Sequence, residues 1–138
     1  MRRPTPSKRS GIFAAELIFV LPILMLVVFA LVEMSLILAA ERKLSEVSGV
    51  VARTGSLGGT DADMTAVMKS ALGGAGTMWA DHAHHAVTPT KPEDRHPGTP
   101  LTVVVTLPAR YVGPNLLRSI GSDLAGATLV GRTVIVIE

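Results

Sequence analysis

The sequence has no cysteine, few aromatic residues and, between Leu17 and Val32, no charged residue. Without cysteine there is neither a disulfide framework nor a thiol nucleophile, so packing has to stabilise any folded domain. With one Trp, one Tyr and three Phe, the chain lacks the basic surface interleaved with aromatics that is typical of nucleic-acid binding. The uncharged run of 16 residues instead indicates a membrane protein.

The charge balance also argues against a nucleic-acid partner. The chain has 13 Lys and Arg against 11 Asp and Glu, with a pI of about 9.4. Four of the basic residues lie within the first nine positions, so the rest of the chain has nine basic against 11 acidic side chains, a charge of −2. The basic character therefore belongs to a short N-terminal segment, and we expect no nucleic-acid partner.

The apolar run predicts one membrane-spanning helix. With its apolar flanks it exceeds the roughly 20 residues that a helix needs to cross the hydrocarbon core. More basic residues precede the run than follow it closely, which favours a cytoplasmic N-terminus and an extracytoplasmic C-terminal part. We expect a basic leader at 1–11, a transmembrane helix at 12–40, its extramembrane continuation at 41–55 and a small extracytoplasmic domain at 56–138.

Residue patterns beyond the membrane segment predict an α+β domain. Apolar spacings of three and four at Leu44, Val47 and Val51 continue the first helix until residues 54–61, and a second helix runs from Asp61 to "GGAG" at 73–76. Two β-branched runs, at 101–107 and 127–138, predict paired antiparallel strands. We expect "WADHAHHAV" to add a third or edge strand, and "GPNLLRSIG" a short turn of helix over the sheet.

Glu16 is an unusual residue at the edge of an apolar helix, because a carboxylate there is costly without compensation. A basic leader, Gly11, four apolar or small residues, Glu16 and a long apolar helix follow one another in an order that resembles type IV pilin precursors. More narrowly, "ELIFVLP", "ALVEMS" and "ERKLSEVSGVVARTG" resemble the TadE-like family of tight-adherence pilus assembly proteins. The resemblance is strongest over residues 11–55.

The resemblance implies a minor pilin or pseudopilin of the bacterial cytoplasmic membrane. It implies cleavage by a prepilin peptidase between Gly11 and Ile12, where glycine lets the peptide lie extended, and pairing of Glu16 with the new amine of a neighbouring subunit. Its implied partners are that peptidase, the major and other minor pilins, the assembly platform and the lipid bilayer. It implies no cofactor and no catalytic residue.

The roles of three residues in the first helix can also be interpreted without the resemblance. Glu16 is also compatible with an interfacial carboxylate turned to water, although its context favours the assembly role. Glu33, about 25 Å further along a helix that rises 1.5 Å per residue, is expected at the opposite interface. Pro22 either kinks the helix or is a tolerated membrane-helix proline.

The histidines of "DHAHH" are the remaining candidates for chemistry. His82, His84 and His85 are weak zinc-ligand candidates, with His82 and His84 sharing a face if the segment is a strand, but a catalytic site needs about three converging ligands. There is no glycine-x-serine-x-glycine elbow and no phosphate-binding glycine loop. We therefore expect a solvated loop or edge strand.

Three classes of function follow from these patterns. The first, which we favour, is a non-enzymatic structural subunit of a pilus. The second is a signal-anchored extracytoplasmic binding module, in which a signal peptidase would cut after Ala30 or Ala40. The third is a hydrolase with a histidine-based metal site.

Overall fold

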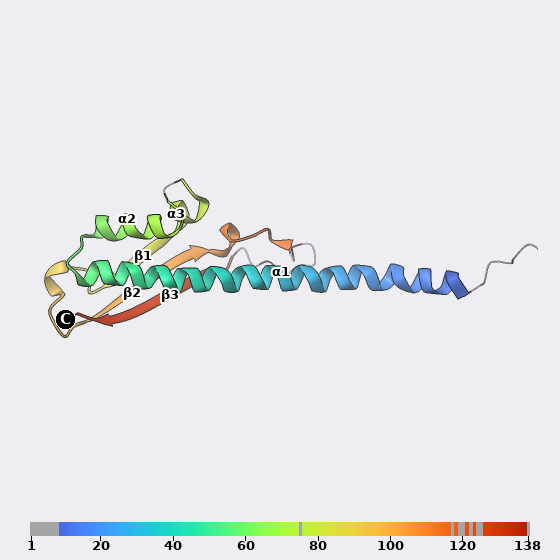
Figure 1. Ribbon diagram of the computed structural model, residues 1–138, viewed down its shortest axis with the longest axis horizontal. Helices are drawn as coiled ribbons and strands as arrows, with labels where there is room; N and C mark the ends of the chain where they lie inside the picture. The colour runs from blue at the N-terminus through green and yellow to red at the C-terminus, as the bar shows by residue number, and fades with distance from the viewer. Residues whose placement is uncertain are drawn as a thin grey trace, which may run out of the picture.

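The computed structural model describes residues 9–74, 76–116, 118, 121, 123 and 126–137, with the side chains of the first helix described from Glu16 onward. A 48-residue helix, α1, runs the length of the molecule, and the other elements gather around its C-terminal half (Figure 1). In chain order the elements are α1 (Arg9–Ser56), α2 (Asp61–Ala71), α3 (Met78–His82), β1 (His84–Thr88), η1 (Pro92–Asp94), β2 (Pro100–Pro108), η2 (Ala109–Tyr111) and β3 (Thr128–Val136). The α+β prediction is confirmed.

The apolar stripe of α1 beyond the membrane segment forms the centre of the core. Leu44 and Val51 are completely buried and Val47 is 1% exposed, as their spacing predicts. The helix ends at Ser56, within the glycine-containing segment expected to stop it. One continuous helix therefore joins the apolar N-terminal segment to the folded domain.

The second helix has well-defined ends. It begins at Asp61, as expected, and its N-cap is Thr60, because Thr60 and Asp63 form a reciprocal capping box. The Asp63 carboxylate accepts hydrogen bonds from the Thr60 hydroxyl and backbone N–H at 2.7 and 2.9 Å, and these bonds lower the pKa of Asp63. Gly73 and Gly74, with φ of +112° and +92°, end the helix as expected.

The sheet has three antiparallel strands in the order β1-β2-β3. Alternate residues of β2 are fully buried towards the helices, namely Leu101, Val103, Val105 and Leu107. The predicted pairing of the two β-branched runs is confirmed, with Val104 opposite Arg132. The expected third strand is confirmed only from His84 onward, because the preceding residues form α3.

The expected turn of helix in 113–121 falls partly outside the described residues. Its described beginning lies against α1, since a Cβ at Gly113 would come within 2.9 Å of Leu36 Cδ1.

Helix α1 approaches β3 closely enough that one glycine is required. A Cβ on Gly131 would overlap the backbone of Leu44 and lie 2.6 Å from the nitrogen of Ser45. Nearby, the hydroxyls of Ser48 and Thr133 are hydrogen-bonded at 2.6 Å, which satisfies a fully buried serine. Neither contact was expected from the sequence.

Candidate functional site

The N-terminal part of α1 projects from the folded domain as a bare apolar helix. Among the described residues, α1 is the one helix long and apolar enough to cross a membrane, with a mean hydropathy of 2.8 in its most apolar window and 6% of that window buried. Leu17 is 63% exposed and Phe19 76% exposed. This segment has the composition and exposure of a membrane anchor.

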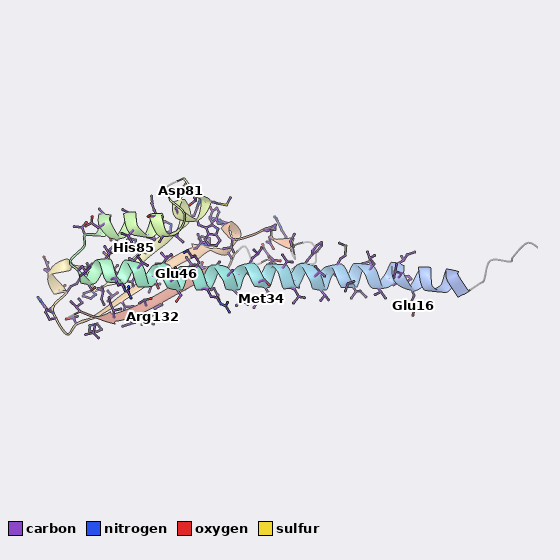
Figure 2. The ribbon with its side chains drawn as sticks, viewed as in Figure 1. Glu16, Met34, Glu46, Asp81, His85 and Arg132 are labelled. Atoms are coloured by element: carbon purple, nitrogen blue, oxygen red, sulfur yellow. The ribbon has the colours of Figure 1, made fainter. Side chains whose placement is uncertain are left out.

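Glu16 lies on this bare segment, far from the sheet (Figure 2). Its side chain is exposed, so the folded domain of the same chain does not cover the carboxylate. Gly11 and Ile12 lie within the first part of α1, but the side chain of Ile12 is outside the described part of the chain. Positions 12 and 16 are four residues apart, about one helical turn, so they occupy the same face of α1.

Pro22 lies inside α1, and the helix is continuous on both sides of it. The proline has no N–H to donate to the carbonyl of Ile18, one turn earlier. Both interpretations of this residue, a local kink and a tolerated membrane-helix proline, remain predictions.

Glu33 is covered by the folded domain of the same chain. Its side chain is only 6% exposed. Its expected place at the opposite membrane interface stays a prediction. The segment after β2 folds back over α1 here and forms a small, partly open pocket of about 20 Å³; the lining residues are Glu33, Leu36, Ile37, Ala109, Arg110, Val112, Gly113 and Asn115. Asn115 also donates to Asp123 at 2.7 Å, which ties the two ends of this connection together.

A sequence signal for this burial exists. Glu33 precedes Ile37, Ala40 and Leu44 at spacings of four, three and four, so it belongs to the stripe that forms the core. Because the residue is charged and adjoins the apolar run, its membership of the stripe is easily overlooked.

The three candidate zinc ligands do not converge. His82 lies in α3, where its Nδ1 donates to the Met78 carbonyl at 2.9 Å, while His84 is exposed on β1. The expectation that His82 and His84 share a strand face is therefore wrong, because a helix ends between them. His85 faces α2 and forms an ion pair or hydrogen bond with Asp61 at 2.9 Å. Within the described residues, no group of three or more His, Cys, Asp or Glu side chains is placed to hold a metal ion.

An aromatic cluster fastens α3 to the segment after β2. The His82 ring stacks on Tyr111 with centroids 3.7 Å apart, and the Arg110 guanidinium carbon lies 4.8 Å from the centre of the Tyr111 ring. Trp79 Nε1 donates to the Tyr111 carbonyl at 2.8 Å. These histidine and tryptophan contacts are structural, and they hold η2 in the position from which the chain passes over Glu33.

Comparison with known proteins gives one family match. Residues 11–53 match the model of the family described as TadE-like protein. No curated protein and no solved structure matches the chain. The matched range covers the site of the expected cleavage, Glu16, the whole bare segment and the packed stripe as far as Val51. Over these residues, about a third of its length, the chain is therefore similar to TadE-like proteins.

Proposed function

We propose that this protein is a minor pilin or pseudopilin that takes part in building a tight-adherence pilus. The exposed carboxylate of Glu16 on a bare apolar helix carries the proposal, because it lies inside the segment that matches the TadE-like family. A carboxylate at this depth is costly in hydrocarbon and needs a cationic partner. The folded domain of the same chain leaves the Glu16 carboxylate accessible to a cationic partner.

In the proposed mechanism, a prepilin peptidase cuts between Gly11 and Ile12 and creates an amine at Ile12. The amine and the Glu16 carboxylate then lie about one turn apart on the same helix face, so both enter the contact between neighbouring helices together. Pairing across that contact neutralises two charges that would otherwise be buried without compensation. The partners in this proposal are the peptidase, the major and other minor pilins, and the assembly platform.

The membrane orientation belongs to the same proposal. The basic residues of the leader keep the N-terminus in the cytoplasm, and the sheet with α2 and α3 lies outside the bacterial cytoplasmic membrane. In this location the protein acts by assembly rather than catalysis, as is typical of the family that it matches.

The burial of Ala40 argues against one form of the signal-anchored alternative. Ala40 is completely buried in the core, in the middle of a helix that continues to Ser56. A signal peptidase that cut after Ala40 would divide a packed helix. Ala30 remains the alternative cleavage position to be tested.

The variant Glu16→Gln separates assembly from insertion. Insertion and cleavage should continue, because the apolar run and Gly11 are unchanged and loss of the charge eases membrane residence by about 2–3 kcal/mol. Incorporation into the pilus should fail, because the amine of the incoming subunit would be buried without a counter-charge, at a cost of several kcal/mol, on the order of 3–5.

The measurement compares processed protein in the membrane with protein that co-purifies with pilus components. Glu41→Gln is the matched control, because Glu41 is an exposed carboxylate on the same helix beyond the bare segment. Normal assembly of Glu16→Gln would contradict the proposed role. If both variants lost incorporation into the pilus equally, the loss would follow from removing any carboxylate of α1 and would not support the pairing of Glu16.

A further inference from the structure

The change from bare to packed helix occurs at one position of α1. Every residue from Leu17 to Val32 is exposed or partly exposed, whereas Glu33 is 6% exposed and Ala40 is completely buried. Between them, Ile37 packs against the core. The folded domain therefore begins at Glu33, seven residues before the end of the transmembrane helix expected from hydropathy alone.

The bare segment is already long enough for a bilayer. Residues 12–32 span about 31 Å at 1.5 Å per residue, which matches the roughly 30 Å of a typical hydrocarbon core. If the core extended to Ala40, the segment after β2 would also be immersed. That segment carries Arg110, Asn115 and Arg118, whose charged and polar groups are unfavourable in hydrocarbon.

The segment after β2 is the part of the folded domain nearest to the bare helix. In Figure 1 its orange ribbon reaches farther along α1 towards the N-terminal end than β1, α2 or α3. The contact between Gly113 and Leu36 places it one helical turn beyond Glu33. Two contacts from α3 fix its position, namely the hydrogen bond from Trp79 and the stacking of His82 on Tyr111.

The side chains of this segment suit a layer of lipid headgroups. Arg110 and Arg118 are exposed, and Tyr111 is partly exposed. Of the acidic residues described nearby, Asp123 is engaged by the Asn115 amide, and Glu33 is buried in the pocket that Arg110 also lines. Arginine and tyrosine are favoured at the membrane interface, and exposed basic groups there are attracted to anionic lipids.

We propose that residues 109–116 and 118 form a membrane-contact surface that rests on the anionic headgroups of the bilayer crossed by α1, with the membrane boundary at Glu33 rather than Ala40. The inference rests on membrane anchoring by α1, which is part of the proposed function. Its consequence is that the folded domain is held against the membrane instead of standing above it on a helical stalk.

Because the chain has no cysteine, single engineered cysteines can carry an environment-sensitive fluorophore without background labelling. The reporting position is exposed Pro114 (Pro114→Cys). Phe19→Cys reports on the bare segment, and Glu93→Cys in η1 reports on the opposite end of the folded domain (Figure 1). Full-length protein is reconstituted in phosphatidylglycerol-containing nanodiscs, with nitroxide quenchers either on the headgroups or deep in the acyl chains.

Headgroup nitroxides should remove most of the fluorescence at position 114 and little at position 93, while acyl-chain nitroxides should quench position 19. Replacing the anionic lipid with a neutral one, or combining Arg110→Gln with Arg118→Gln, should reduce quenching at position 114. If position 114 were as weakly quenched as position 93 while position 19 was quenched, the membrane-contact surface would be wrong and the membrane anchor would stand. An unquenched position 19 would overturn the anchoring on which the proposed function also depends. If quenching at position 114 changed neither with lipid charge nor with the replacement of both arginines, the proposed recognition of headgroups would be wrong.

Discussion

Gly131 offers the sharpest test of how the long helix is attached to the sheet. In the variant Gly131→Ala, the added Cβ would overlap the Leu44 backbone and approach the Ser45 nitrogen to 2.6 Å, whereas ordinary contacts begin near 3.4 Å. These are main-chain atoms in the middle of a helix, so they cannot move aside as a flexible side chain would. Either α1 or β3 has to shift by most of an ångström.

The expected destabilisation is about 1–3 kcal/mol, the usual cost of overpacking a well-packed core. Alanine loses less conformational entropy than glycine on folding, which returns about 0.4–1 kcal/mol where the backbone conformation suits it. A folded domain of this size should then lose on the order of 5–15 °C in Tm, at about 4–8 °C per kcal/mol.

The assay is thermal unfolding of the full-length protein in detergent, followed by the fluorescence of the single tryptophan, Trp79, which packs against the core. Gly126→Ala is the matched control, because a Cβ at Gly126 meets no atom within 4 Å. We expect the control to leave Tm nearly unchanged or slightly raised. If Gly131→Ala melted like Gly126→Ala, the close crossing of α1 over β3 would be wrong.

Two further predictions concern the terminal strand and the cleavage site. Truncation after Gly126 removes β3 and uncovers β2 and α1, so the shortened chain should be degraded by added protease under conditions that leave the full chain intact; a resistant truncated protein would show that β3 is dispensable. Gly11→Val should largely block maturation, because a β-branched side chain intrudes at the cut bond. The control Ser10→Ala should mature normally. Immunoblots that showed equal processing of both variants would contradict the steric argument.

The periodicity of the sequence was sufficient to predict the main elements. Leu44, Val47 and Val51 identify the buried stripe because a helix repeats every 3.6 residues, and β-branched runs identify β2 and β3. Each of these patterns identifies a helix or a strand from residues that are close together in the sequence. The α+β class follows from them without any knowledge of tertiary contacts.

The remaining features depend on contacts between segments distant in the sequence. The place of Glu33 in the buried stripe has a local signal, but no local pattern shows that a connection some 80 residues later folds over it. For the same reason, no local pattern shows that Gly131 lies against the backbone of α1. His82 and His84 would share a face only in a strand, and the expected strand segment begins five residues before β1, within α3.

The mature N-terminus is the most direct measurement of the central claim, that this chain is a processed pilin-like subunit. Mass spectrometry of the protein from membrane fractions of cells that make the pilus should identify a chain that begins at Ile12, with Glu16 as its fifth residue. A chain that begins after Ala30 or Ala40, or one that keeps residues 1–11, would contradict the claim.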